Sequence, residues 1–175
     1  MSEKSLFLTR LINFLLQDAA AIYANVGLRC LDNNLMKFNA REHFFRSGLL
    51  LIAAGPIYFN RLKKKMMDFK TADASFAYSR ECLFIENILV LYNSSDIHAF
   101  ADHVYNYDNV SHLDSWCLEM LYEIRTLVQD QYEAAEIAAK EEQERMRQEQ
   151  EKIEEEKREK KRRLKEQIMS GEKKG

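Results

Sequence analysis

The scarcity of helix-breaking residues is the feature that most constrains how this 175-residue chain can fold. The sequence contains one proline and five glycines, and neither residue occurs between Pro56 and Gly171. Because proline and glycine end helices and form tight turns, their rarity favours long helices. We predict an all-α fold, in which a compact bundle of five to six helices is followed by a long charged C-terminal helix projecting from the last core helix.

Charge divides the chain into two parts. Residues 1–136 carry 13 Lys and Arg against 17 Asp and Glu, whereas residues 137–175 carry 13 against 11. Charged residues therefore fill 24 of the last 39 positions but only 30 of the first 136. We predict an all-helical globular domain over 1–136 and a highly charged extended helical tail, frayed at its end, over 137–175. The net charge of −2 argues against a protein built mainly to coat nucleic acid.

The cysteines and the N-terminal segment indicate the cellular compartment in which the protein is expected to act. Cys30, Cys82 and Cys117 are odd in number and widely spaced, which fits neither a disulfide framework nor a zinc-ligand cluster. Reduced thiols in a helical core favour the cytoplasm or another reducing compartment. The first residues lack the unbroken apolar run of a signal peptide, because Arg10 and Asn13 interrupt them at helical spacing. We therefore expect no signal peptide and no transmembrane span.

Residues 3–31 have the period of an amphipathic helix. The apolar positions that fall along one stripe are Leu8, Leu11, Leu15, Ile22 and Val26. The polar segment 32–34 is expected to form a turn, because Asp and Asn side chains compete with the helix for backbone hydrogen bonds.

The uncharged run between Arg46 and Arg61 resembles a membrane span but is too short for one. A helix needs about 20 apolar residues to cross the hydrocarbon core, and this run has 14 residues with Gly55-Pro56 inside it. We predict a helix over 39–54, a tight turn at Gly55-Pro56 and a second helix over 57–70. Integral membrane insertion is not expected. A re-entrant insertion and a buried strand at 49–54 are the alternatives.

Further helices are predicted over 73–92 and 96–105, followed by a loop at NYDNV, residues 106–110. Ser111 and Asp114 then have the spacing of a capping box, with Asp in the role of Glu. No helix breaker follows until Gly171, so the last helix is expected to begin at Ser111 and to continue into the tail.

No pattern in the chain indicates catalysis or the binding of a cofactor or metal. The five glycines are too scattered to form a phosphate-binding loop. His98 and Asp102 are four residues apart and share a helical face, but His103 lies about 140° around the helix from His98. A metal site would need ligands from elsewhere. We predict no catalytic residues, no cofactor and no metal site, and hence no enzyme.

Two basic clusters are candidate binding sites. The first lies on the helix predicted over 57–70 and consists of Arg61, Lys63, Lys64, Lys65 and Lys70. A solvated lysine face explains it without a ligand, whereas a functional face would contact phosphate, anionic lipid or an acidic protein surface. Stacking on single-stranded nucleic acid is not expected, because Tyr58 and Phe69 fall on the buried stripe.

The tail supplies the second candidate. Glu154 and Arg158, like Glu141 and Arg145, are spaced to form ion pairs one turn apart. One apolar position per heptad is too few for a coiled-coil seam, so we expect no self-association through the tail alone. The residues predicted to contact a partner are weak apolar anchors and a cationic cluster: Met146, Ile153, Leu164 and Ile168, with Lys160, Lys161, Arg162 and Arg163.

Together these features favour a non-enzymatic structural or adaptor subunit of a larger protein assembly. Its helical domain would dock on one partner, its charged C-terminal helix would reach a second, and both partners would be protein subunits. A nucleic-acid-associated protein, using the basic clusters at 61–65 and 157–165, is the first alternative. A small helical enzyme or metalloprotein is the second.

Overall fold

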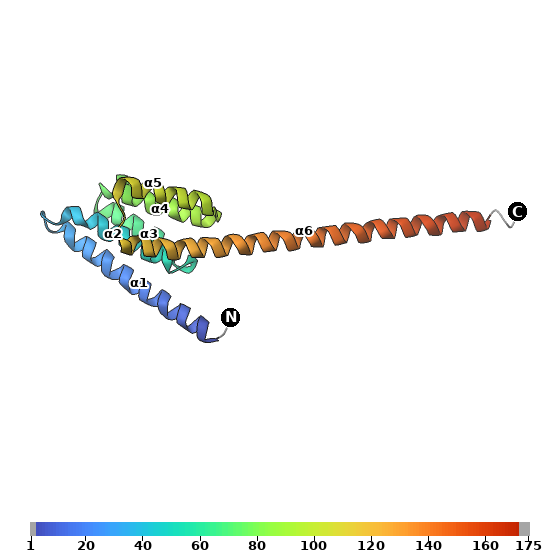
Figure 1. Ribbon diagram of the computed structural model, residues 1–175, viewed down its shortest axis with the longest axis horizontal. Coiled ribbons are helices and arrows are strands. Elements are labelled where there is room, and N and C mark those ends of the chain that lie inside the picture. The colour runs from blue at the N-terminus through green and yellow to red at the C-terminus, as the bar shows by residue number, and fades with distance from the viewer. Residues whose placement is uncertain (1–2, 172–175) are drawn as a thin grey trace. The chain divides into compact units, whose positions relative to one another are not determined.

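The computed structural model describes the backbone of residues 3–171 and the side chains of 7–163 and 165. Helices account for the regular structure of this part, and it contains no strand (Figure 1). The α-helices are α1 (Glu3–Leu31), α2 (Ala40–Ala53), α3 (Phe59–Ala72), α4 (Arg80–Ser94), α5 (Ile97–Ser111) and α6 (Ser115–Gly171). Three short 3₁₀ helices are η1 (Lys37–Asn39), η2 (Pro56–Tyr58) and η3 (Phe76–Tyr78). The predicted all-α bundle with a long C-terminal helix is confirmed.

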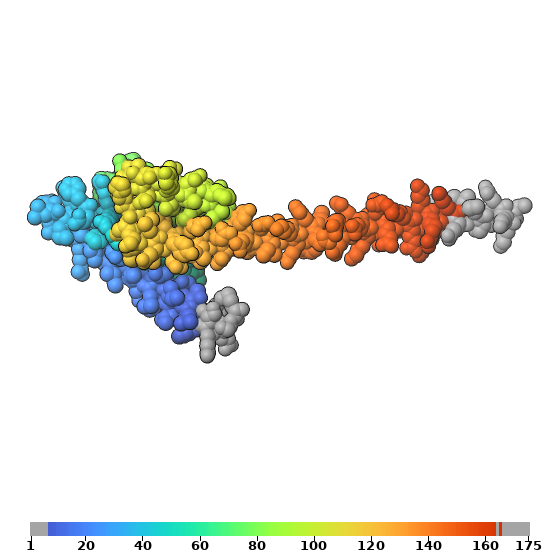
Figure 2. Space-filling view, in the orientation of Figure 1, coloured from blue at the N-terminus to red at the C-terminus, as the bar shows by residue number. Residues whose placement is uncertain are grey.

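Contacts divide the chain into two units, residues 1–132 and 133–175. Unit 1 contains α1 to α5 and the first part of α6, and Val128 is the last buried residue in the described part of the chain. Unit 2 is the remainder of α6, and every side chain described in it is exposed (Figure 2).

Aromatic side chains form the centre of the unit 1 core. Phe44 of α2 stacks on Phe69 of α3, with ring centroids 4.1 Å apart, and meets Phe76 of η3 edge-on at 5.2 Å. These three rings are completely buried. All three cysteines are buried as free thiols around this core. Burial of this much apolar surface is the main force that stabilises such a bundle.

The uncharged run that could have been taken for a membrane span lies in this core. Residues 47–54 are all buried, within α2 and at its end. Gly55 then adopts φ +97°, a left-handed conformation that a residue with a Cβ adopts only with strain, and Pro56 begins η2. The predicted helix–turn–helix at this point is confirmed, and the alternative of a buried strand at 49–54 is wrong.

Helix α1 makes its closest contacts through its small residues, although Leu16, Tyr23 and Leu28 also lie half-buried against the core. Ala20, Ala24 and Gly27 are buried against α2, which runs alongside (Figure 1). Ser47 of α2 donates a hydrogen bond to the Ala20 carbonyl oxygen, with 2.8 Å between the two oxygens. A Cβ on Gly27 would lie only 2.6 Å from Phe44 Cε1. Small side chains therefore allow the two helices to approach closely.

The apolar stripe recognised in the sequence of α1 is consequently turned away from the core. Its members are all exposed: Leu8, Leu11, Leu15, Ile22 and Val26. Periodicity identified the helix and its bounds correctly. It could not indicate which of two opposite faces would meet α2, because close packing selected the small-residue face over the more hydrophobic one.

The α5–α6 junction differs from the predicted one. The segment 106–110 continues α5, which ends at Ser111 because His112 adopts a left-handed conformation (φ 49°). Helix α6 begins at Ser115, and Asp114 caps it by accepting a hydrogen bond from Cys117 N at 2.8 Å. The expected capping box starting at Ser111 is therefore wrong. A carboxylate at Asp114 provides a cap as strong as a serine hydroxyl.

The helix predicted over 73–92 also begins later than expected. Residues 73–79 form a turn and η3, and α4 starts at Arg80 after Ser79, whose hydroxyl accepts a hydrogen bond from Cys82 N at 3.1 Å. At the start of α5 the cap is Asp96, which accepts a hydrogen bond from Ala99 N at 2.9 Å.

Candidate partner-binding surfaces

The basic residues of α3 are divided between two sides of the helix. Arg61 donates a hydrogen bond to Gln17 of α1, whereas Lys70 Nζ lies 2.5 Å from Glu86 Oε1 of α4. The hydrogen bond to Glu86 raises the pKa of Lys70, although burial partly opposes it. Lys64 is exposed and Lys65 is half-buried. The cluster noted in the sequence is thus not one continuous basic face.

Lys63 and Lys70 lie at the rim of an apolar groove between α3 and α4. The groove has a volume of about 330 Å³. Its lining consists of Leu62, Lys63, Met66, Met67, Lys70, Ile85, Glu86, Leu89 and Val90. Because Glu86 pairs with Lys70, the remaining charge in the lining of the groove is that of Lys63.

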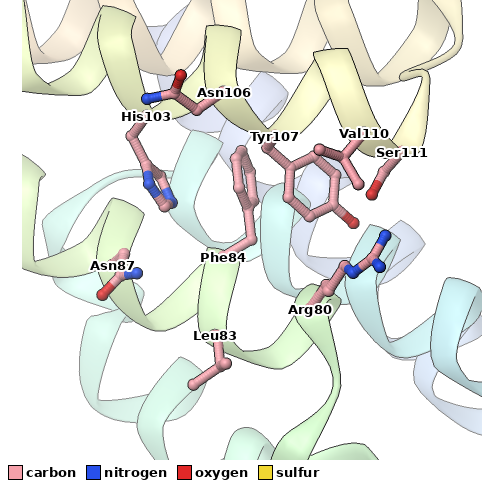
Figure 3. Close-up of a pocket in the computed structure, with 9 residues that line it drawn as sticks. All are labelled: Arg80, Leu83, Phe84, Asn87, His103, Asn106, Tyr107, Val110 and Ser111. Carbon is pink, nitrogen blue, oxygen red and sulfur yellow. The ribbon is translucent and has the colours of Figure 1, made fainter.

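A second hollow, the α4–α5 pocket, lies between the next two helices (Figure 3). Its volume is about 340 Å³. The residues that line it are Arg80, Leu83, Phe84, Asn87, His103, Asn106, Tyr107, Val110 and Ser111. Phe84 is at its centre, with His103 on one side and Tyr107 on the other (Figure 3). The pocket therefore has an aromatic floor and polar groups toward both ends.

His103 is held at one end by its contact with Phe84. The two rings stack with centroids 4.8 Å apart. Burial lowers the pKa of His103, and a hydrogen bond to the Phe84 backbone opposes this only in part, so the ring is neutral near pH 7. Its Nε2 atom is buried and has no hydrogen-bond partner among the described residues. Buried polar atoms without a partner are uncommon in native proteins.

Tyr107 closes the other end of the floor. Its ring lies 4.2 Å from that of Phe84 and stacks on Phe45 at 5.7 Å. Burial raises the pKa of Tyr107 to about 12. Its hydroxyl lies near Ser111 and the Arg80 guanidinium (Figure 3), and Arg80 makes no ion pair with any residue whose side chain is described.

Arg46 connects α2 to the start of α6. Its Nη2 atom lies 2.7 Å from Glu42 Oε1 and 2.5 Å from Asp114 Oδ2, and its guanidinium stacks 4.9 Å from the Trp116 ring centroid. Burial disfavours the charge on this side chain, but the hydrogen bonds to Glu42 and Asp114 outweigh it and raise the pKa of Arg46. We interpret this cluster as structural, because its charges are already paired.

The outward stripe of α1 forms an exposed apolar surface, to which Phe7, Ile12 and Phe14 also contribute. By length and composition, the segment Phe7–Leu31 could cross a membrane, and it is the one such helix among the described residues. This is weak evidence, because core helices and N-terminal signals meet the same criterion.

In unit 2, Met146 and Ile153 are 50% and 46% exposed, as contact residues must be. Arg158 pairs with Glu154 at 2.6 Å and Arg163 with Glu159 at 2.7 Å, each across one helical turn. Arg145 pairs with Glu142 instead of the expected Glu141. The remaining cations of the cluster, Lys160, Lys161 and Arg162, are exposed. The side chains of Leu164 and Ile168 lie outside those described.

No group of three potential metal ligands converges anywhere in the described part of the chain. His98 and Asp102 both lie on α5, and neither has a third ligand beside it.

Comparison with known proteins shows the family to which the chain belongs. A family model described as soluble NSF attachment protein (SNAP) matches residues 10–129, more than half of the chain. The chain belongs to the SNAP family. The match begins within α1, includes the α4–α5 pocket and ends within α6.

Individual relatives agree with this membership. The chain is 27% identical to the human alpha-soluble NSF attachment protein over 113 residues, 65% of this chain and 37% of the relative. It is 31% identical to a probable vesicular-fusion protein sec17 homologue of Schizosaccharomyces pombe over 108 residues, 62% of this chain and 37% of the relative. The chain thus spans about two fifths of the length of these two relatives. No solved structure matches it significantly.

Sequence reasoning did not find the α4–α5 pocket. A signal was present, since Arg80 and Phe84 are four residues apart, as are His103 and Tyr107, so each pair lies on one helical face. The sequence did not show that these two faces meet, because that depends on α4 and α5 being neighbours in the fold.

Proposed function

We propose that this chain is a non-enzymatic adaptor subunit of a vesicle-fusion assembly, and that NSF is one of its protein partners. The observation that carries the proposal is the SNAP-family match over residues 10–129, because the matched relatives are named as NSF attachment and vesicular-fusion proteins. In this proposal the chain uses no catalytic residues and no cofactor, and it acts in the cytoplasm.

The proposal assigns separate contacts to the two units. Unit 1 docks on one protein through its helical surfaces, and unit 2 reaches a second through the cationic cluster and its apolar anchors. Three features support a binding role for unit 2: it lies beyond the matched region, it buries none of its described side chains, and ion pairs one turn apart stabilise its helix. A helix of this kind presents its charges to a partner at little conformational cost.

Binding to purified NSF tests the proposal. The full chain and the fragment 1–132 would be compared by surface plasmon resonance, together with a variant in which Lys160, Lys161, Arg162 and Arg163 are all changed to Ala. Alanine preserves helix propensity, so a loss of affinity would report the lost charge. We expect the full chain to bind, and both the fragment and the quadruple variant to bind at least about tenfold more weakly, as the loss of several charge-assisted contacts implies.

A second quadruple variant is the matched control: Arg145, Arg147, Lys152 and Lys157, all changed to Ala. It removes the same charge from the same helix outside the cationic cluster, and we expect near-normal binding. Equal weakening by both variants would mean that only net charge matters. The absence of any NSF binding by the full chain would refute the assignment of NSF, and full binding by the fragment 1–132 would refute the role of unit 2.

The nucleic-acid alternative is weakened by the arrangement of α3, where Arg61 and Lys70 already have partners within unit 1. It makes a distinct prediction nevertheless. Affinity for nucleic acid should fall about 10³-fold or more between about 50 and 200 mM salt if six or more phosphates are contacted. Binding that is undetectable at the lower salt concentration removes this alternative.

A further inference from the structure

The α4–α5 pocket has polar groups whose hydrogen-bonding capacity is not used within the chain. His103 Nε2 is buried without a partner, and Arg80 forms no ion pair, among the residues whose side chains are described. Asn87 and Asn106 are exposed on facing helices beside His103 (Figure 3). These groups surround an aromatic floor instead of pairing with one another, which is the arrangement expected of a ligand site.

The polar end near Arg80 is suited to a carboxylate. Arg80, the Tyr107 hydroxyl and the Ser111 hydroxyl come together there (Figure 3). Ser111 donates its hydroxyl proton to the Tyr107 oxygen, which leaves the Tyr107 hydroxyl and the Arg80 guanidinium to donate hydrogen bonds to an anionic oxygen. Glu81, whose charge acts on Tyr107, lines a neighbouring hollow that shares Tyr107 and Ser111 with this pocket, but it does not line this pocket. Arg80 is therefore the one charged side chain that lines the pocket within the described part of the chain.

The aromatic floor of the pocket and its end near His103 indicate the chemistry of the rest of the ligand. Phe84, Tyr107 and Val110 offer an apolar surface next to the Arg80 end. Asn87 and Asn106 lie further along, and an Asn side chain carries both a donor and an acceptor, as a peptide group requires. The volume of about 340 Å³ accommodates one or two residues. A free aliphatic acid would leave the two amides unused.

We propose that the α4–α5 pocket binds the C-terminal residue of a polypeptide that ends in an apolar side chain. The terminal carboxylate lies against Arg80, Tyr107 and Ser111. The apolar side chain lies on the floor formed by Phe84, Tyr107 and Val110, and the preceding peptide group bonds to Asn87 and Asn106. This site lies in unit 1 and requires neither NSF nor unit 2, so its failure and the failure of the proposed function are separable.

Titration of the full chain by NMR tests the site. The ¹⁵N-labelled protein would be titrated with acetyl-Ala-Ala-Leu carrying a free C-terminus, with the same peptide as its C-terminal amide, and with 4-methylpentanoate. That acid presents the leucine side chain and a carboxylate but no peptide group. We expect the free peptide to shift the signals of pocket residues and to bind about tenfold more tightly than either other probe, since each lacks one set of charged or polar contacts.

Arg80→Gln is the decisive variant. Arg80 is exposed at the start of α4, so the change should leave the fold intact, and we expect about a tenfold loss of affinity for the free peptide. The matched control is Arg125→Gln, which removes an exposed arginine of α6 in unit 1 and should leave the affinity unchanged.

Three results would overturn the proposal. The first is that the free peptide shifts no signal of a pocket residue. The second is that the peptide and its amide bind equally, or that Arg80→Gln has no effect, because the pocket would then recognise apolar surface without a carboxylate. The third is that 4-methylpentanoate binds more tightly than the peptide, because the natural ligand would then be a small acid rather than a polypeptide end.

Discussion

At the scale of single residues, Asp114 shows how one exposed carboxylate can stabilise two parts of a bundle. One oxygen accepts the Cys117 N–H at the start of α6, and the other lies 2.5 Å from the Arg46 guanidinium of α2. Hydrogen bonds from the Cys117 backbone, the Cys117 thiol and Arg46 lower the pKa of Asp114, and burial opposes them only in part. The ionised form is therefore the one that the folded state favours.

We expect Asp114→Ala to lower the free energy of unfolding by about 1–2 kcal/mol, the usual cost of losing a helix cap. Asp114→Asn is the control: it keeps a capping oxygen but loses the charge, so it should cost less. Urea denaturation at pH 7 measures both. Equal costs would show that the ion pair with Arg46, not the cap, carries the effect.

The same variants have a predictable pH dependence. Because the pKa of Asp114 is lower in the folded state than its ordinary value of 3.8, its stabilising contribution is present above about pH 4 and is lost as the pH falls through the folded pKa. The difference in stability between the parent chain and Asp114→Asn should therefore shrink below pH 4. A difference that stayed constant down to pH 2 would contradict this.

At the scale of elements, the packing of α1 on α2 makes glycine a better residue than alanine at position 27, contrary to their helix propensities. Alanine is favoured over glycine in a helix by about 1 kcal/mol. At Gly27, however, the added Cβ would lie 2.6 Å from Phe44 Cε1 and 3.2 Å from His43 Cβ. Phe44 is completely buried between Phe69 and Phe76 and cannot move freely.

We therefore expect Gly27→Ala to destabilise unit 1 by about 1–3 kcal/mol, the typical cost of overpacking a core. Thermal unfolding followed by circular dichroism measures it. Gly48→Ala is the matched control: its Cβ would meet three atoms of Ile85 at 3.0–3.2 Å, a smaller overlap than at Gly27, so its cost should be smaller. A stabilised Gly27→Ala variant would show that α1 and α2 are further apart than described.

At the scale of the whole molecule, the buried core that stabilises the fold ends well before the last helix does. Every buried residue in the described part of the chain lies at or before Val128, whereas α6 continues to Gly171. The helix of unit 2 depends on local ion pairs such as Glu154–Arg158, each worth about 0.2–0.5 kcal/mol. Such pairs weaken in salt.

We expect the fragment 1–132 to unfold within about 3 °C of the full chain, because it retains the whole described core. The full chain should also show an additional helical signal that decreases in 1 M salt, and this signal should be missing from the fragment. Circular dichroism at both salt concentrations measures these effects. A fragment that unfolds about 10 °C lower would mean that residues 133–175 stabilise the core.

Some features of this chain follow from local sequence and were predicted correctly. The helices at α1, α2 and α3 and the turn at Gly55 depend on residue propensities and on apolar period, which act over a few residues. The α5–α6 junction was misplaced because the sequence offers two caps, Ser111 and Asp114. Asp114, which caps α6, also bonds to Arg46, 68 residues away along the chain, and such a contact cannot be read from local sequence.

The sequence by itself determined that this protein is all-α, that its charge is concentrated in a long final helix, and that its cysteines are unsuited to disulfides or zinc. These properties depend on composition and periodicity, which need no knowledge of neighbours. Only the tertiary structure decided which face of α1 meets α2, how the α3 cations are divided, and that α4 and α5 form a pocket around Phe84. Those outcomes depend on contacts between residues far apart in the chain, where side-chain size and shape, and not hydrophobicity alone, decide which face of a helix is buried.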